Sequence, residues 1–234
     1  MALYTLADLH LSLGTDKPMD VFGGAWNGYF EKLQESLSCL SEDDLLVIPG
    51  DLSWGMNLPG ALPDLQFLDR LPGRKLLAKG NHDLWWDTVA KMRRFFEANG
   101  ITTIDFLHNN AFRYGNAAIA GTRGWFFEEE TGGAHDEKIM NREVGRLRTS
   151  LEAARKLGAE RIYCFMHYPP IFGKYECPAI VKMLAEYGVT ACYYGHLHGQ
   201  SHKRAWEGEY GGVDYRLVAA DYLNFQPFLV MNEK

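Results

Sequence analysis

The chain has 234 residues and a formal net charge of −6 at pH 7. Its hydrophobic content of 47% and aromatic content of 13% exclude a disordered chain and indicate a globular protein, long enough to bury a sizeable core. The acidic balance argues against a broad nucleic-acid-binding surface, because such a surface normally needs a basic face.

The sequence also favours one cellular location. No run approaches the roughly 18 apolar residues that a membrane-spanning helix needs, and the initial residues MALYTLADLH lack the basic and apolar regions of a signal peptide. The cysteines show no CxxC spacing, and Cys164 and Cys192 lie in apolar runs where a free thiol behaves as a small hydrophobic group. We therefore expect a cytoplasmic protein without a membrane span. The sequence makes no prediction of its oligomeric state.

Short apolar runs alternate along the chain with longer amphipathic segments, which predicts an α/β fold. In chain order, strands are expected at residues 2–7, 44–49, 75–78, 117–121, 161–166, 190–194 and 215–220. Helices are expected near residues 26–40, 61–70, 86–98, 136–157 and 176–187. Because no internal repeat or Pro/Ser-rich linker interrupts this pattern, we predict a single domain over residues 1–234.

The fourth helix has the clearest pattern. Its apolar residues recur at steps of three and four: Met140, Val144, Leu147, Leu151 and Ala154. Asp136 is the expected N-cap, and Gly158 is expected to end the helix.

Five of the predicted strands lead into loops that present aspartate, asparagine or histidine. These loop residues are Asp8, His10, Asp51, Asn81, His82, Asp83, His167, His196 and His198. Five of the eight histidines in the chain lie in these loops. Ligand sites of open α/β sheets form beyond the carboxyl ends of the strands, so we expect these side chains to share one site.

These residue types coordinate divalent metal ions. Asp8 and His10 are one residue apart in a segment expected to be extended, so both side chains can point to the same side and hold one ion. Asp51 offers two oxygens that can bridge two ions. The mixed oxygen and nitrogen ligands are too many for one tetrahedral structural zinc. They suit two ions about 3.5–4 Å apart, which activate a water for in-line displacement at phosphorus. The spacing leaves open which ion His196 or His198 serves.

The segments that carry these residues form a recognisable set. DLH (8–10), GD (50–51), GNHD (80–83), His167 and GHLH (195–198) resemble the motif set of the calcineurin-like metallophosphoesterases, in the order found in that family. The resemblance implies an α/β fold of one particular kind, a four-layer αββα sandwich with two mixed β-sheets and a dinuclear metal site at its rim.

The resemblance also implies a role for each loop residue. One metal would take Asp8, His10, Asp51 and His198, and the other would take Asp51, Asn81, His167 and His196, with Asp51 bridging. His82 matches a histidine that protonates the leaving group or stabilises the transition state, and Asp83 matches the carboxylate that orients it. Two divalent ions are expected as cofactors. Mn²⁺ or Fe is favoured over Mg²⁺ because the imidazoles outnumber what a hard, oxygen-seeking ion tolerates, and Zn²⁺ is the alternative.

Some residues outside the motifs are candidates for substrate contacts. Arg123 follows a predicted strand and can clamp a phosphate, although a surface arginine is the alternative, and Tyr168 directly follows His167. Tryptophans near the loops can stack on a base or pack in the core; they are Trp54, Trp85, Trp86 and Trp125. Residues 14–30, with glycines and aromatic residues, suit ordinary packing, a lid, a substrate contact or a partner surface.

The sequence therefore predicts a metal-dependent phosphohydrolase that acts on a small phosphorylated substrate. The tryptophans favour a phosphodiester or nucleotide-like substrate, and a phosphomonoester of a small metabolite is the alternative. A non-catalytic protein-binding scaffold of the same fold is a further reading, but a scaffold has no need to retain His82.

Overall fold

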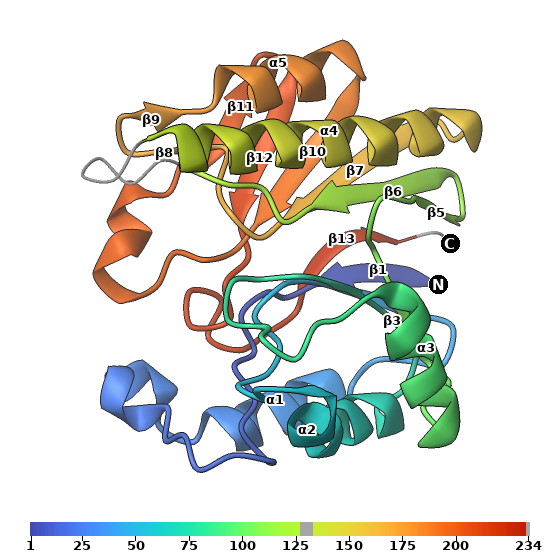
Figure 1. The fold of residues 1–234 in the computed structure, drawn as a ribbon, viewed down its shortest axis with the longest axis vertical. Helices are drawn as coiled ribbons and strands as arrows, with labels where there is room; N and C mark the ends of the chain where they lie inside the picture. The colour runs from blue at the N-terminus through green and yellow to red at the C-terminus, as the bar shows by residue number, and fades with distance from the viewer. Residues whose placement is uncertain (127–132, 233–234) are drawn as a thin grey trace. The chain divides into compact units, whose positions relative to one another are not determined.

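The computed structural model describes residues 1–126 and 133–232 (Figure 1). The chain divides into two compact units, Met1–Phe106 with Val218–Lys234, and Leu107–Leu217. Each unit contains one large mixed sheet and its own helices, so the expected α/β class with two mixed sheets is confirmed. The number of domains stays a prediction.

The first unit is built on a five-stranded sheet with the order β13-β1-β2-β3-β4. Its strands are β1 (Ala2–Thr5), β2 (Leu45–Pro49), β3 (Arg74–Ala78), β4 (Ile104–Phe106) and β13 (Phe228–Asn232). β1 to β4 run parallel, and β13 is antiparallel to β1. The carboxyl ends of the parallel strands therefore lie at one edge of this sheet.

Three helices pack on this sheet: α1 (Tyr29–Leu37), α2 (Leu58–Arg70) and α3 (Val89–Ala98) (Figure 1). Each contributes buried side chains to a single hydrophobic core, for example Leu33, Leu65 and Phe96.

Two short 3₁₀ turns, η1 (Asp20–Phe22) and η2 (Gly24–Trp26), precede α1. The helix expected near 26–40 therefore begins three residues later, because Gly28 adopts a left-handed conformation with φ 61° immediately before Tyr29.

The second unit is built on a six-stranded sheet with the order β11-β12-β10-β7-β6-β5. Its strands are β5 (Phe112–Tyr114), β6 (Ala117–Thr122), β7 (Arg161–Met166), β10 (Val189–Tyr194), β11 (Gly208–Tyr210) and β12 (Val213–Leu217). The central strands β6, β7, β10 and β12 are parallel, and the edge strands β5 and β11 are antiparallel to their neighbours. A small hairpin, β8 (Ile171–Phe172) and β9 (Tyr175–Glu176), and a 3₁₀ turn, η3 (Gly199–Arg204), complete the unit.

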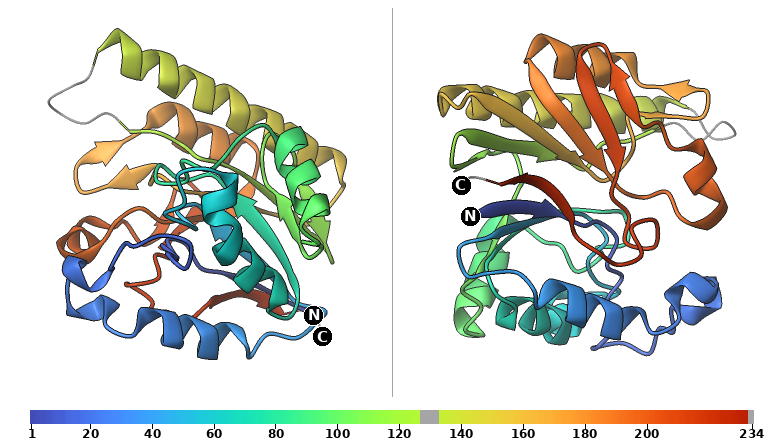
Figure 2. Two further views of the ribbon diagram at one scale, coloured as in Figure 1. Left: turned by 60° about the horizontal axis from the view of Figure 1, so that its bottom comes forward. Right: turned by 180° about the vertical axis from the view of Figure 1, so that it is seen from behind.

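Two helices, α4 (Ala134–Lys156) and α5 (Pro178–Glu186), cover one face of the six-stranded sheet (Figure 1, Figure 2). α4 ends just before Gly158, as expected, but it begins at Ala134, with Gly133 rather than Asp136 at the N-cap. Asp136 lies in the first turn, where the helix dipole still favours a carboxylate. The prediction that Asp136 caps the helix was wrong by one turn.

Candidate metal centre

Three loops of the first unit begin where parallel strands end. Asp8 lies three residues beyond β1, Asp51 two residues beyond β2, and Asn81 three residues beyond β3. Backbone pairing continues past the first two strands, because the Asp8 N–H donates to the Gly50 carbonyl at 3.0 Å and the His10 N–H donates to the Asp51 carbonyl at 3.0 Å. This pairing fixes Asp8, His10 and Asp51 next to one another.

The backbone of these residues is unusual. Asp8, His10 and Asp51 all have positive φ, at 62°, 46° and 53°. Non-glycine residues rarely adopt this left-handed conformation, which is enriched at functional sites. The expectation that Asp8 and His10 are extended was therefore wrong: a left-handed backbone, rather than the alternation of a strand, brings their side chains together.

The three side chains form a buried cluster with the chemistry of a metal site. Their residues are 0%, 3% and 1% exposed, in the order Asp8, His10, Asp51. A carboxylate oxygen of Asp8 lies within 4.8 Å of a His10 nitrogen and within 4.8 Å of an Asp51 oxygen, and His10 Nε2 lies 3.8 Å from Asp51 Oδ2. Two buried carboxylates this close repel each other unless a cation lies between them. The donor set therefore fits a divalent metal ion.

Asp51 is held from the neighbouring loop. The His82 backbone N–H donates to Asp51 Oδ1 at 2.8 Å. A Cβ atom at Gly80 would lie 2.0 Å from the same oxygen and 2.3 Å from the Asp51 nitrogen. Only glycine at position 80 leaves room for Asp51, which explains the glycine of the GNHD motif in this chain.

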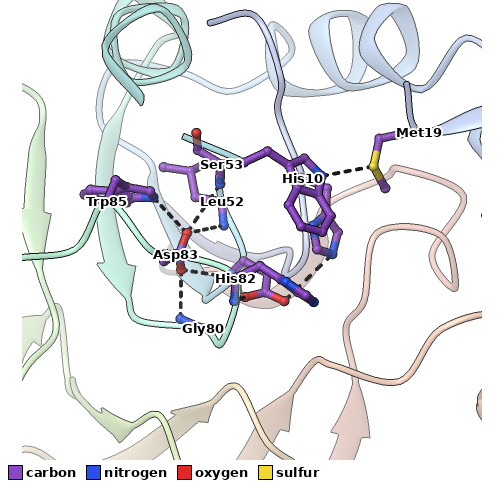
Figure 3. A network of polar contacts seen from close by, with 10 residues as sticks. His10, Met19, Leu52, Ser53, Gly80, His82, Asp83 and Trp85 are labelled. Atoms are coloured by element: carbon purple, nitrogen blue, oxygen red, sulfur yellow. Dashed lines mark hydrogen bonds and ion pairs between the residues drawn. The ribbon is translucent and has the colours of Figure 1, made fainter. Parts of the chain in front are cut away.

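Asp83 is fully buried and binds the backbone of both loops. Its carboxylate accepts hydrogen bonds from the N–H groups of Asp51 (2.9 Å), Leu52 (2.9 Å) and Gly80 (2.8 Å), and from the Trp85 indole (3.0 Å) (Figure 3). A longer bond of 3.3 Å comes from Ser53. Burial raises the pKa of this carboxyl, although these donors oppose the rise. The orientation of the His82 ring by Asp83 stays a prediction.

A second buried acid, Asp64 of α2, was missed from the sequence. Asp64 accepts a hydrogen bond from the Leu13 N–H at 2.7 Å and another from the Ser53 hydroxyl, so it ties the loop after His10 to the loop after Asp51. Burial raises its pKa. The available signal was an aspartate on the apolar stripe of a helix, three residues after Ala61 and one before Leu65.

His82 is exposed and lies among aromatic rings of the same unit. Its ring centroid is 4.5 Å from that of Trp54 and 5.6 Å from that of His10. Trp54 also stacks on His10, with centroids 5.0 Å apart and planes 24° apart. By contrast Trp85 is only 2% exposed, and Trp86 packs on Phe106 with centroids 5.3 Å apart. Of the two, Trp85 is a packing residue that cannot stack on a substrate.

The second unit presents a parallel set of strand ends. Arg123, His167 and His196 follow β6, β7 and β10 at the same edge of the sheet, and the Gly195 N–H donates to the His167 carbonyl at 3.1 Å. His196 has a left-handed backbone with φ 72°, and its ring centroid lies 5.1 Å from that of His167. His198 lies two residues further along the same loop.

Tyr168 and Arg123 lie beside these histidines. The centroid of the Tyr168 ring is 4.4 Å from that of His196, and its N–H donates to the Arg123 carbonyl at 2.8 Å. The Arg123 guanidinium lies 5.0 Å from the Trp125 ring centroid and 5.9 Å from that of Tyr168. Its Nε atom is buried and has no hydrogen-bond partner within residues 1–126 and 133–232. Arg123 is therefore more enclosed than the surface arginine considered as its alternative.

Glu143 of α4 supports this edge and was also missed from the sequence. Its carboxylate is fully buried, accepts a hydrogen bond from the Thr122 hydroxyl at 2.8 Å, and pairs with Arg146 at 2.7 Å. Thr122 directly precedes Arg123, so Glu143 fixes the end of β6 from which Arg123 extends. As with Asp64, the signal was an acid on the apolar stripe of a helix.

Comparison with known proteins agrees with the motifs. The family model described as calcineurin-like phosphoesterase matches residues 1–200. The chain therefore belongs to the calcineurin-like phosphoesterase family and is a metal-dependent phosphohydrolase. Comparison with curated proteins finds no match.

Solved structures show the same fold at low sequence identity. Phosphopantetheinyl hydrolase (PptH) from Mycobacterium tuberculosis is 15% identical, with 99% of this chain and 96% of that chain covered and a TM-score of 0.63. TT1561 of Thermus thermophilus is 10% identical, with 84% and 81% covered and a TM-score of 0.51. This likeness confirms the metallophosphoesterase fold expected from the motifs. Among the described residues no helix is both long and apolar enough to cross a membrane.

Proposed function

We propose that the chain binds two divalent metal ions and hydrolyses a phosphodiester or nucleotide-like substrate. One ion would be held by Asp8, His10, Asp51 and His198, and the other by Asp51, Asn81, His167 and His196. The observation that carries the proposal is the buried Asp8–His10–Asp51 cluster, whose three residues all have a left-handed backbone. Mn²⁺ or Fe is favoured over Mg²⁺ because the imidazoles outnumber what a hard, oxygen-seeking ion tolerates, and Zn²⁺ is the alternative.

The protein groups around the ions have separate tasks. When bound, the two ions would supply an activated water and stabilise negative charge at phosphorus. His82, exposed beside the cluster, would donate a proton from its imidazole to the leaving oxygen. Arg123 would contact the phosphoryl oxygens through its guanidinium, and Tyr168 would help to fix the substrate next to His196. Asp83 would keep Asp51 and Gly80 in place through its hydrogen bonds to their N–H groups.

The aromatic environment of His82 favours the phosphodiester or nucleotide-like class. Trp54 is partly exposed and its ring lies 4.5 Å from that of His82, so a leaving group protonated by His82 would contact an aromatic face. A phosphomonoester of a hydrated sugar would leave that face unused.

A phosphopantetheinyl ester is a second candidate substrate. The PptH structure covers nearly the whole chain, and large apolar side chains are exposed on the loops that carry the site residues of the first unit: Leu13, Met56 and Leu84. These side chains suit the long aliphatic part of a phosphopantetheinyl group better than a sugar.

A substrate panel with Mn²⁺ tests the proposal. It would contain bis-nitrophenyl phosphate, cyclic nucleotides, dinucleotides, coenzyme A as a carrier of phosphopantetheine, and sugar phosphates. We expect the highest kcat/KM for a diester or nucleotide. A clear preference for sugar phosphates would favour a phosphomonoesterase, and no turnover of any ester with metal bound would favour the scaffold.

A further inference from the structure

Residues 19–26 of the first unit form an exposed segment with two buried ends, which we call the aromatic arm. Met19 and Trp26 are 4% and 3% exposed, whereas every residue between them is exposed. Trp26 is packed against Phe225, with ring centroids 5.2 Å apart. Met19 accepts a hydrogen bond from the Trp54 indole N–H, with 3.1 Å between Nε1 and Sδ (Figure 3). The arm is therefore fixed at one end to Trp54, the ring beside His82.

The arm places a second aromatic ring parallel to Trp54. The Phe22 ring lies 6.5 Å from the Trp54 ring between centroids, and the two planes differ by only 7°. The Lys17 ammonium lies 3.7 Å from the Trp54 centroid and 5.9 Å from the Phe22 centroid. Lys17 thus covers the indole at the distance of a stacked ring.

Phe22 is 55% exposed and is one of several exposed apolar side chains near Trp54, and a patch of this kind marks ligand-binding surfaces more often than a single exposed side chain does. Its neighbour Val21 is 69% exposed and Met56, two residues after Trp54, is 67% exposed. The surroundings of Trp54 are therefore open and apolar, and the ammonium of Lys17 over the ring is on a flexible side chain that can move away.

We propose that Trp54 and Phe22 form the subsite for the leaving group, and that this group carries a flat ring such as a nucleobase. The inference rests on the proposed function: a histidine that protonates the leaving oxygen must lie on the leaving-group side, and Trp54 is in contact with His82. A ligand ring stacked on the face of Trp54 that Lys17 covers would replace the ammonium. Its other face would contact the Phe22 ring, which is parallel to Trp54. Lys17 then occupies the stacking position on Trp54 only while no ligand is bound.

Two ligands that differ only in the ring test the subsite. Adenosine 5′-phosphate and ribose 5-phosphate would be titrated into Zn²⁺-loaded protein carrying ¹⁵N-labelled tryptophan, with the Trp54 indole signal assigned by its loss in Trp54→Phe. We expect adenosine 5′-phosphate to bind about tenfold more tightly and to shift the Trp54 signal, which ribose 5-phosphate leaves in place.

Substitutions of Phe22 and Lys17 should change the affinity for adenosine 5′-phosphate in opposite directions. Phe22→Leu should weaken adenosine 5′-phosphate binding about fivefold, because a parallel ring is lost. Lys17→Gln should strengthen it about threefold, because no cation–π contact has to be broken. Val21→Ala, an equally exposed neighbour, is the control and should bind like the wild type. Ribose 5-phosphate binding should be the same in all four proteins.

Each other outcome has a definite meaning. Equal affinity for both ligands, or an unshifted Trp54 signal, would overturn the subsite even if the substrate panel shows hydrolysis. Weaker binding of adenosine 5′-phosphate by Lys17→Gln would show that Lys17 does not leave the stacking position when the ligand binds. A shift of the Trp54 signal by coenzyme A, but not by adenosine 5′-phosphate or by adenosine 3′,5′-bisphosphate, which lacks pantetheine, would show that Trp54 contacts an aliphatic group rather than a flat ring. Loss of hydrolysis across the panel with ring binding intact would overturn the proposed function instead.

Discussion

Gly80→Ala should disable the metal centre while leaving the fold intact. The new methyl group would lie 2.0 Å from Asp51 Oδ1 and 2.3 Å from the Asp51 nitrogen, whereas carbon and oxygen atoms in contact lie about 3.5 Å apart. Removing this overlap requires the methyl group and Asp51 to move apart by more than about 1 Å. Asp51 is 1% exposed and its Oδ1 already accepts the His82 N–H, so the shift must change either the carboxylate or the loop that carries His82.

A displacement of about 1 Å at a catalytic group costs roughly 10²-fold in rate. We therefore expect Gly80→Ala to lower kcat on bis-nitrophenyl phosphate about a hundredfold and to lower Mn²⁺ content, measured by elemental analysis. Gly145→Ala is the matched control: a Cβ at this helical glycine of α4 meets nothing within 4 Å, and the change should leave activity intact and add about 0.5–1 kcal/mol of stability. If Gly80→Ala retained activity within threefold of the wild type at full metal content, the argument that Gly80 makes room for Asp51 would be refuted.

Three further predictions follow from individual side chains. Asp51→Asn should lower metal content and activity more than His10→Asn, because the proposed bridge touches both ions; equal losses would argue against bridging. His82→Ala should cost about 10²–10⁴-fold on an unactivated ester but little on a nitrophenyl ester. The metal content of this variant should not change, because the hydrogen bond from residue 82 to Asp51 comes from the main-chain N–H. Similar losses of activity on both esters would argue against His82 as the acid. Burial lowers the pKa of the Lys75 ammonium to about 8, so between pH 8 and about 10.4 this group binds fewer protons in the folded protein than in the unfolded chain, and its contribution to stability rises with pH. In urea unfolding, the free energy of unfolding of the wild type should rise relative to that of Lys75→Met by on the order of 3 kcal/mol across this range, and a constant difference between the two proteins would contradict it.

The sequence predicted the central elements of both sheets because their strands are buried and apolar. All seven expected strands and all five expected helices exist, with shifted ends. The short strands β4, β5, β8, β9, β11 and β13 were not predicted, since two or three residues, or an exposed edge strand such as β13, carry little hydrophobic pattern. The strand expected over 215–220 ends at Leu217, because the Ala7 N–H donates to the Val218 carbonyl of the first unit instead.

The candidate ligands could be named from the sequence because each follows a strand in a short motif. Their conformation could not, because a left-handed backbone at Asp8 and His10 depends on pairing with Gly50 and Asp51, which lie more than forty residues away in the sequence. The buried acids Asp64 and Glu143 were missed for a similar reason: each acts through hydrogen bonds to a distant part of the chain.

The number of metal ions bound per chain distinguishes a dinuclear centre from a mononuclear one. Protein purified without chelators, reconstituted with Mn²⁺ and freed of unbound ion would be analysed for metal content per chain, alongside hydrolysis of bis-nitrophenyl phosphate. We expect two ions per chain, and activity that rises with occupancy of the second ion. At most one ion per chain at full activity would contradict the dinuclear centre.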